Sequence, residues 1–397
     1  MQLFNTLTRS TDELVASGRS VGLYVCGITP YDTTHLGHAR TYLVFDVLVR
    51  HLIHSGMRVD YVQNITDVDE SIVEKAQALG ESYEELGDHF MARYVEDLAA
   101  LGMIPATVYP RATDALEEMQ EAIRRLLATD HAYRVDGDVY FSVGSRADYG
   151  KLSRLSTDRM LEIEAEQDAT TVDDPRKNNP LDFPLWRATD DSGPSWSSPW
   201  GRGRPGWHLE CSTLALRHLG RQVDIHGGGT DLIFPHHEAE IAQSESLTGT
   251  EPFARHWVHV EMARLDGEKM SKSRGNLVFV KDLLTDYSAD AIRLYVLGVH
   301  YRSPLDFEED VLRGCAEKAV NLAEAARGPR RLGGDDNDAP RAEKEFIAAL
   351  EDDLDTPRAI SILEDLADRA LSKPGALAQK TVRSLAARLG LSLETTA

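Results

Sequence analysis

Cysteine is scarce in this chain of 397 residues, which contains only Cys26, Cys211 and Cys315. Three widely spaced cysteines cannot form the disulfide framework that stabilises small secreted domains, so metal binding or burial must explain them. The sequence also lacks an apolar run long enough to cross a bilayer, and its first residues lack a signal-peptide pattern. These absences predict a soluble, cytoplasmic protein with no membrane partner, which we expect to be a monomer.

Positive charge is in deficit as well. The chain has 43 lysines and arginines against 65 aspartates and glutamates, which gives a formal net charge of -22. Such a protein does not bind polyanions by bulk attraction, so any RNA partner must be held at a local basic patch. The length exceeds that of one ordinary domain and predicts two or three linked modules.

The order of apolar patterns predicts a parallel α/β sheet that an insertion interrupts. A β-prone run at 21–26 leads through a turn into helical spacing at 39–52, and a second strand is expected at 59–63. After position 113 the pattern changes, and sheet character resumes only at 223–226. Beyond Leu305 the chain reads mostly as amphipathic helix, which predicts a helical C-terminal module.

His35-Leu36-Gly37-His38 lies where the first strand and turn lead into a helix. Unpaired backbone amides and the helix dipole favour an anion there, and phosphate is the obvious candidate. Both histidines can point at one phosphate group, and Gly37 lets a nucleotide approach the backbone. Histidines at a helix start are more often caps or surface groups, so this motif alone decides little.

A second motif, Lys269-Met270-Ser271-Lys272-Ser273, places two lysines on a loop of small residues. Such a loop can close over phosphates, where its ammonium groups neutralise the charge of departing pyrophosphate. The alternative is an ordinary solvated lysine loop. The two motifs in this order, separated by half of an α/β sheet, are far more specific than either one.

Together these motifs match the signatures of the class I aminoacyl-tRNA synthetases, which the chain resembles. Four further runs resemble the cysteine-specific branch: 24–27 (YVCG), 61–69 (YVQNITDVD), 206–211 (GWHLEC) and 225–240 (IHGGGTDLIFPHHEAE). The resemblance covers most of the chain. It implies catalytic roles for His35, His38, Lys269 and Lys272, and it implies ATP, accompanied by Mg²⁺, as a substrate.

The resemblance also sets the expected domain boundaries. It implies a Rossmann-type, doubly wound parallel sheet whose two halves are residues 1–112 and 206–266. A connective insertion is expected at 113–205, the mobile lysine loop with a stem-contact region at 267–312, and the helical C-terminal module at 313–397.

Four residues offer a donor set suited to one Zn²⁺ per chain, namely two thiolates, an imidazole and a carboxylate. They are Cys26, Cys211, His236 and Glu240. Each cysteine alone would more often be a small buried hydrophobe, but the four together also match the zinc ligands of the resembled family. His237 and Glu238 are the alternative ligands.

Zinc also provides a reason for the substrate, because a soft thiolate can bind such a site whereas a serine hydroxyl is a poor ligand. By resemblance, four residues hold the polar groups of the amino acid and close its pocket: Gly27, Thr29, Thr66 and Trp207. The alternative for Trp207 is a place in the core.

A glycine run follows the second half of the sheet, at the point where a doubly wound sheet binds a nucleotide. There the glycines would admit the adenosine and Asp231 would accept a hydrogen bond from a ribose hydroxyl. The expected ATP-binding residues are Gly37, Gly227, Gly228, Asp231 and Lys272. Taken alone, a run of glycines is only a loop.

Two acceptors are compatible with this chemistry, since the resembled family includes the tRNA(Cys) ligases and the cysteine:glucosaminyl-inositol ligase of mycothiol synthesis. The amino sugar is favoured by the runs 28–32, 273–280 and 352–356 and by the early end of the chain. A tRNA acceptor is favoured by Glu240, which the amino-sugar ligases lack, and by the runs 39–42, 180–186 and 302–305. We predict a cysteine-tRNA ligase of a truncated type, with the amino-sugar ligase as the alternative. A degenerate, non-enzymatic paralogue is disfavoured because both ATP motifs and all four candidate ligands are intact.

Overall fold

The computed structural model describes residues 1–16, 18–30, 33–167, 172, 174–189, 193–271, 274–327, 338–373 and 375–394. Some sequence predictions fall wholly or partly outside these residues, namely the role of Lys272, the end of the run 28–32 and the start of the run 273–280. Within the described stretches, no helix has both the length and the apolar character needed to cross a membrane.

A four-stranded parallel sheet forms the centre of the molecule, in the order β10-β9-β3-β4. Its strands are β3 (Ser20–Ile28), β4 (Arg58–Ile65), β9 (Val223–Gly229) and β10 (Ala254–Val260). The first half of the sheet grows from β3 towards β4, and the second half grows from β9 towards β10. The order therefore reverses between β3 and β9, and a crevice outside the carboxyl ends of these two strands is where such sheets bind ligands.

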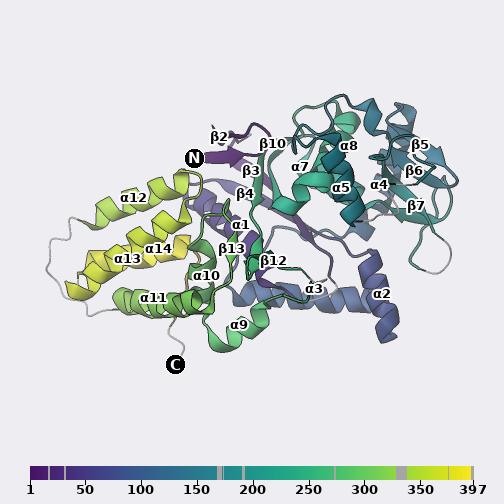
Figure 1. The fold of residues 1–397 in the computed structure, drawn as a ribbon. Coiled ribbons are helices and arrows are strands. Elements are labelled where there is room, and N and C mark those ends of the chain that lie inside the picture. The colour runs from purple at the N-terminus through teal and green to yellow at the C-terminus, as the bar shows by residue number, and fades with distance from the viewer. Residues whose placement is uncertain are drawn as a thin grey trace.

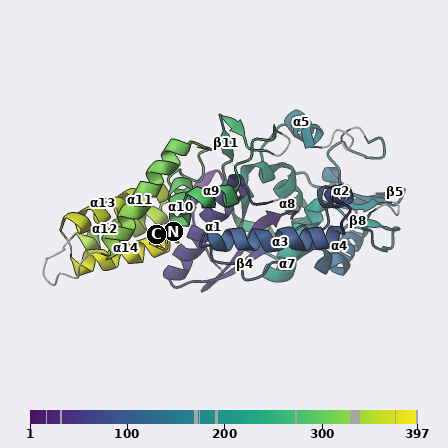
Figure 2. The same ribbon diagram turned by 90° about the horizontal axis from the view of Figure 1, so that it is seen from below.

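Helices flank this sheet, as the Figure 1 ribbon shows. They are α1 (Leu36–His54), α3 (Tyr83–Ala100), α7 (Trp207–Leu219) and α8 (Glu238–Thr248), while α2 (Glu70–Leu79) packs against α3 away from the sheet. Figure 2 shows α3 lying along the underside of the molecule.

Alternation along β3 decides which side chains meet which helix, because neighbouring residues of a strand point to opposite faces. Val25 packs in one buried cluster with Phe45 of α1. The next residue, Cys26, lies in the other cluster with Leu209 and Cys211 of α7. The strand thus presents one thiol to the helix that carries the second.

The segment between the two halves of the sheet folds into its own antiparallel sheet, in the order β5-β6-β7-β8. The strands are β5 (Ala132–Val135), β6 (Asp138–Phe141), β7 (Phe183–Ala188) and β8 (Gly203–Pro205). Helices α4 (Leu116–Ala128) and α5 (Thr157–Gln167) accompany it. In Figure 1 this part lies at the end of the molecule opposite the C-terminal helices.

Smaller elements complete the part of the molecule before the C-terminal helices. A hairpin of β1 (Gln2–Asn5) and β2 (Ser10–Glu13) opens the chain. A three-stranded sheet is formed by β11 (Ala263–Leu265), β12 (Glu268–Lys269) and β13 (Leu305–Asp306), and α9 (Val280–Asp286) follows the lysine loop.

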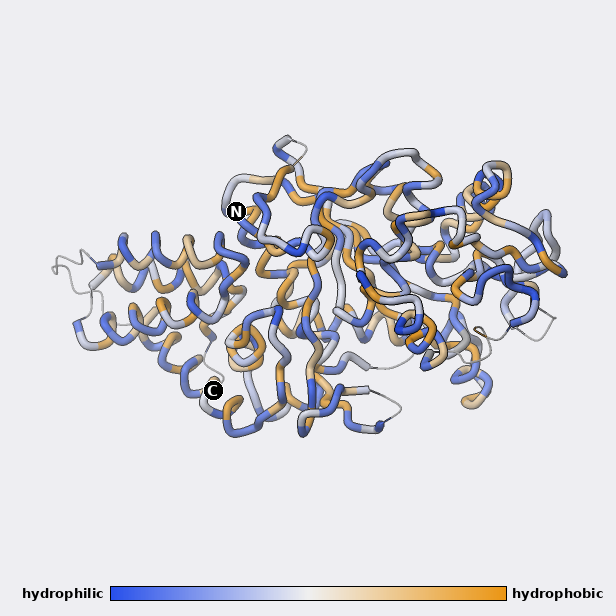
Figure 3. Tube along the Cα trace, turned by 45° about the horizontal axis from the view of Figure 1, so that its top comes forward, coloured by the Kyte–Doolittle hydropathy of each residue, from blue (hydrophilic) through white to orange (hydrophobic). Residues whose placement is uncertain are grey.

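The C-terminal part is helical, as the sequence predicts. It comprises α10 (Ala289–Leu297), α11 (Glu309–Arg327), α12 (Ala339–Glu351), α13 (Thr356–Ser372) and α14 (Ala376–Arg388). Figure 3 shows hydrophobic and hydrophilic segments alternating along these helices, as expected when each buries one face. Buried Arg293 of α10 joins this part to the rest, since its guanidinium donates to the carbonyl of Leu101 at 3.0 Å and pairs with Asp46 of α1.

Candidate active site

The two cysteines predicted as ligands lie together in the core. Cys26 comes near the end of β3 and Cys211 from the first turns of α7, and their Sγ atoms are 3.8 Å apart. A tetrahedral zinc site with Zn–S bonds of about 2.3 Å separates two thiolates by about 3.8 Å. The sulfur spacing therefore fits one shared zinc ion without rearrangement.

The imidazole and carboxylate of the predicted set complete this cluster. His236 Nε2 lies 3.2 Å from Glu240 Oε1, and the same oxygen lies 3.5 Å from Cys26 Sγ. One donor atom from each of Cys26, Cys211, His236 and Glu240 falls within 4.8 Å of all the others, and all four residues are buried. A fully buried carboxylate beside two thiols is unfavourable unless a cation compensates it, so the residues fit a bound metal.

His237 also belongs to the cluster, which the sequence left open as an alternative. Its Nε2 lies 3.3 Å from Cys26 Sγ. With His226, whose Nε2 is 2.9 Å from Glu240 Oε2, it forms a second compact donor set of Cys26, His226, His237 and Glu240. Sequence inspection missed His226, although its place in a buried strand directly before the glycine run was a signal.

The other alternative, Glu238, is not a ligand of this cluster. Its carboxylate accepts hydrogen bonds from the backbone amides of Ser153, at 2.8 Å, and Leu152. Glu238 is the first residue of α8, whereas Glu240 lies two residues further on and points to a different side of the helix. The two carboxylates differ because the direction of a side chain on a helix changes by about 100° with each residue.

Further histidines surround the candidate ligands. His237 Nδ1 lies 2.8 Å from His259 Nε2, and His236 Nδ1 lies 2.9 Å from His208 Nδ1. Burial and neighbouring histidines lower the pKa of His236 and His237 well below the usual value, which keeps their rings neutral. Neutral imidazole is the form that ligates metals, and a second ring on the remote nitrogen fixes its orientation.

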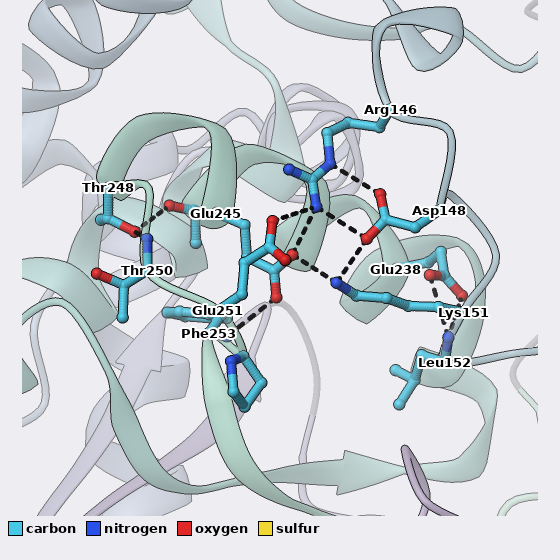
Figure 4. Close-up of polar contacts among 12 residues, drawn as sticks. Arg146, Asp148, Lys151, Leu152, Glu238, Glu245, Thr248, Thr250, Glu251 and Phe253 are labelled. Atoms are coloured by element: carbon cyan, nitrogen blue, oxygen red, sulfur yellow. Dashed lines mark hydrogen bonds and ion pairs between the residues drawn. The ribbon is translucent and has the colours of Figure 1, made fainter.

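A polar network ties the insertion to the helix that carries Glu240 (Figure 4). Buried Glu245 of α8 accepts hydrogen bonds from Arg146, at 2.8 Å, and from Lys151, at 2.5 Å. Asp148 pairs with the same two cations. Because α8 carries Glu240 as well as these contacts, the position of the insertion and the shape of the metal cluster are linked.

The residues predicted to bind the amino acid border this cluster. Trp207, at the start of α7, is 40% exposed, and its ring lies 4.2 Å from that of His236. The alternative of a core tryptophan is therefore wrong. Gly27 has no room for a side chain, since a Cβ atom would lie 1.6 Å from the carbonyl oxygen of Asn64. Thr66 is buried just beyond β4, and Thr29 is partly buried just after β3.

The histidine motif begins α1, as predicted. His35 is the N-cap residue, its Nδ1 accepts a hydrogen bond from the backbone amide of His38 at 3.4 Å, and the two rings stack 3.7 Å apart. A Cβ atom on Gly37 would lie 2.9 Å from the His35 ring, so this glycine lets the ring lie against the helix. Burial, followed by the charge of His35, lowers the pKa of His38 well below its usual value.

The segment after the lysine loop crosses the histidine motif. Leu36 donates a backbone hydrogen bond to Val278 at 2.7 Å, and Val280 donates one to Thr34 at 3.0 Å. The start of α1 and the segment after the lysine loop are thus joined by their backbones.

Lys269 and Asp231 form an ion pair, with Nζ 2.9 Å from Oδ2. The sequence predicts a phosphate partner for the first and a ribose partner for the second, so the structure brings both to one place. Close packing gives one of the glycines before Asp231 a further structural role. At Gly227 a Cβ atom would lie 2.2 Å from the ring of Phe45, so close packing of α1 on the sheet requires the glycine there.

Solved structures of class I synthetases share this fold. The methionyl-tRNA synthetase of Mycobacterium tuberculosis, solved with methionyl-adenylate, matches with a TM-score of 0.65 at 17% identity, over 94% of this chain and 88% of that chain. A LeuRS of Agrobacterium radiobacter K84, solved in a ternary complex with tRNA, matches with a TM-score of 0.62 at 12% identity, over 96% and 85% of the two chains. The architecture is that of a class I aminoacyl-tRNA synthetase.

The sequence narrows this class to one branch. Residues 13–317 match the family described as the tRNA synthetases class I (C) catalytic domain. A cysteine–tRNA ligase of Dehalococcoides mccartyi (strain BAV1) is 43% identical over 401 residues, which cover 99% of this chain and 87% of that protein. Another, of Paramagnetospirillum magneticum, is 47% identical over 385 residues, which cover 96% and 82%. The chain belongs to this cysteine family of class I tRNA synthetases.

Proposed function

We propose that the protein is a cysteine-tRNA ligase that activates cysteine with ATP and transfers the cysteinyl group to the 3′ end of tRNA(Cys). The observation that carries this function is the buried cluster of Cys26, Cys211, His236 and Glu240. The cluster lies at the carboxyl end of β3, where a doubly wound sheet binds its ligands. Similar proteins of the same family are cysteine–tRNA ligases.

In the first step, the carboxylate of cysteine attacks the α-phosphorus of ATP, and pyrophosphate leaves. His35 and His38 hold phosphate oxygens at the start of α1, where the helix dipole favours the same charge. Lys269 and Lys272 neutralise the departing pyrophosphate, whose Mg²⁺ arrives with ATP. Gly37, Gly227, Gly228 and Asp231 contact the nucleotide, and the Asp231–Lys269 ion pair gives way to the ribose and the phosphates.

The amino acid lies beside Trp207, with Gly27, Thr29 and Thr66 around its polar groups. The four clustered residues would hold one Zn²⁺, which supplies a soft acceptor for a thiolate. In the second step a ribose hydroxyl of the terminal adenosine of tRNA attacks the cysteinyl carbonyl of the adenylate, which forms the ester and releases AMP. We place the enzyme in the cytoplasm as a monomer, with residues 113–205 as the connective insertion, 267–312 as the lysine loop and stem-contact region, and 313–397 as the helical module.

Exchange of labelled pyrophosphate into ATP should depend on cysteine and show on the order of a thousandfold lower efficiency with serine. The reason is that a thiolate binds a zinc site far better than a hydroxyl does, whereas pocket size alone separates small side chains by only about 10–200-fold. The measurement is the exchange rate over a range of both amino acids. Comparable exchange with serine would remove thiolate recognition from this function.

The acceptor is tested by a direct comparison. We expect labelled cysteine and ATP to charge tRNA(Cys) and to leave glucosaminyl-inositol unmodified, since Glu240 completes a four-donor cluster that the amino-sugar ligases lack. Since the protein carries a net charge of -22, tRNA must be held by local lysines and arginines that neutralise phosphates, and such contacts weaken as salt rises, so we also expect charging to fall with salt. Rapid amide formation with the amino sugar and no charging of tRNA would assign the alternative acceptor and leave the activation step intact.

A further inference from the structure

Arg40 is a buried arginine near the start of α1 that none of the roles above uses. It lies two residues after His38, and only 1% of its surface is exposed. Its Nη2 atom donates hydrogen bonds to two backbone carbonyls, those of His300, at 3.3 Å, and Ser303. Its Nε and Nη1 atoms have no hydrogen-bond partner among the described residues. A buried guanidinium with unused donors stabilises a fold poorly, so its value to the protein lies in the segment that it holds.

The segment held by Arg40 is the 298–304 loop, which connects α10 to β13. Asp353, in the turn between α12 and α13, holds the same loop by its side chains. Asp353 Oδ1 accepts a hydrogen bond from the hydroxyl of Tyr301 at 2.5 Å, and Oδ2 accepts one from Nε of Arg302 at 2.7 Å. The loop is thus fixed by two elements that lie far apart in the sequence, which gives it a defined place relative to α1.

The 298–304 loop supports one end of the lysine loop. Strand β13 follows it directly and pairs with β11, whose other partner is β12, the strand that carries Lys269. The loop also contacts the chain just before β11, since the backbone amide of Glu261 donates to the carbonyl of Tyr301 at 2.8 Å. A displacement of the 298–304 loop is therefore passed on to Lys269 through two strand pairings.

The other end of the lysine loop is attached to α1 itself, where the amide of Leu36 donates to the carbonyl of Val278 at 2.7 Å. Both ends are thus tied to α1, one directly and the other through Arg40 and β13. Adenylate formation requires His38 and Lys269 to reach the phosphates of one ATP molecule at the same time. Misplacement of reacting groups by about 1 Å can cost about a hundredfold in rate, so the distance between the two motifs must be held closely.

We propose that Arg40 is a positioning residue of the activation step. By holding the 298–304 loop against α1, it sets the place of Lys269 relative to His38 and so aligns the two ATP motifs. This inference rests on the proposed function, since it concerns the same ATP site. The competing explanation is a structural one, in which Arg40 only adds stability to the contact between α1 and the loop.

The first test removes the donors of Arg40 and keeps much of the length of its side chain. For Arg40→Met we expect the maximal rate of cysteine-dependent pyrophosphate exchange to fall about tenfold or more, while the affinity for cysteine stays within about twofold of the wild-type value. Arg50→Met is the matched control. Arg50 lies on the same helix, and its guanidinium donates to the carbonyl of Gly102 at 2.6 Å, outside the 298–304 loop. That variant should keep the wild-type rate.

A double-mutant cycle with Lys269→Ala separates positioning from stability. Because Arg40 acts through the lysine motif, Arg40→Met should cost less than about threefold in rate once Lys269 is absent. An undiminished loss in that background, or a wild-type rate in Arg40→Met alone, would overturn the proposal in favour of the structural explanation. Arg40→Lys keeps the charge and three donors, so it should show a smaller loss with the same dependence on Lys269, and it serves as the test if Arg40→Met does not fold.

Amide hydrogen exchange measures the same linkage without substrate. In Arg40→Met we expect residues 263–270 and 300–306 to exchange about tenfold faster, and in Arg50→Met we expect no change there. Unchanged exchange at 263–270 in Arg40→Met would contradict the linkage between the loop and the lysine motif. Failure of the proposed function is distinguishable, because then the wild-type protein itself shows no cysteine-dependent pyrophosphate exchange, whereas the hydrogen-exchange result still decides whether Arg40 holds the lysine motif in place.

Discussion

Cys26→Ala should reduce the zinc content of the purified protein from about one ion per chain to below about a tenth. Cys26 is shared by both compact donor sets, the one with Cys211 and His236 and the one with His226 and His237. Removing it leaves neither set with more than three donors. It also removes the only thiolate of the second set, so we expect cysteine-dependent pyrophosphate exchange to disappear together with the metal.

The same geometry predicts a graded result at the second cysteine. Cys211→Ala destroys the first donor set but leaves the second intact, so this variant should retain more zinc than Cys26→Ala while losing cysteine activation. Metal analysis after dialysis measures both. Cys315→Ala is the matched control, because this third buried cysteine lies in α11, outside both donor sets. Full zinc occupancy in Cys26→Ala would exclude this cluster as the metal site.

His38→Ala should slow cysteine activation by on the order of a hundredfold or more, with little change in the affinity for cysteine. His38 lies on the first turn of α1, stacked on His35, at the end of the helix where an anion is favoured. Its lowered pKa keeps the ring neutral at physiological pH, so it acts as a hydrogen-bond donor to phosphate oxygens rather than as a fixed charge. Interactions of this type strengthen as charge develops in the transition state.

The measurement is the rate of pyrophosphate exchange at saturating cysteine and ATP, together with the affinity for cysteine from titration. His54→Ala is a suitable control, since His54 is exposed at the last turn of the same helix and contacts the Arg50 carbonyl. That variant should keep the wild-type rate. A His38→Ala enzyme that binds cysteine poorly but reacts at the normal maximal rate would show that His38 serves binding and not the chemical step.

Much of the fold and of the site follows from local patterns. The runs expected to form strands at 21–26, 59–63 and 223–226 all lie within β3, β4 and β9, and the helix expected at 39–52 lies within α1. Alternating or 3.6-residue spacing of apolar side chains is a property of a short stretch of chain, so the sequence displays it directly. The spacing of His236 and Glu240 on one helical turn was visible in the same way.

Only the tertiary structure decided which distant residues meet. His226 approaches Cys26 and Glu240 because β9 pairs with β3, with His226 opposite Tyr24, and no local pattern specifies that neighbour. Glu238 turns towards the insertion and Gly227 makes room for Phe45 for the same reason. The sequence by itself determined the elements, the ATP motifs and the four most plausible ligands. The second donor set depends on strand order and on the rotation of α8. Packing of the whole core selects both, whereas the spacing of residues along the chain does not.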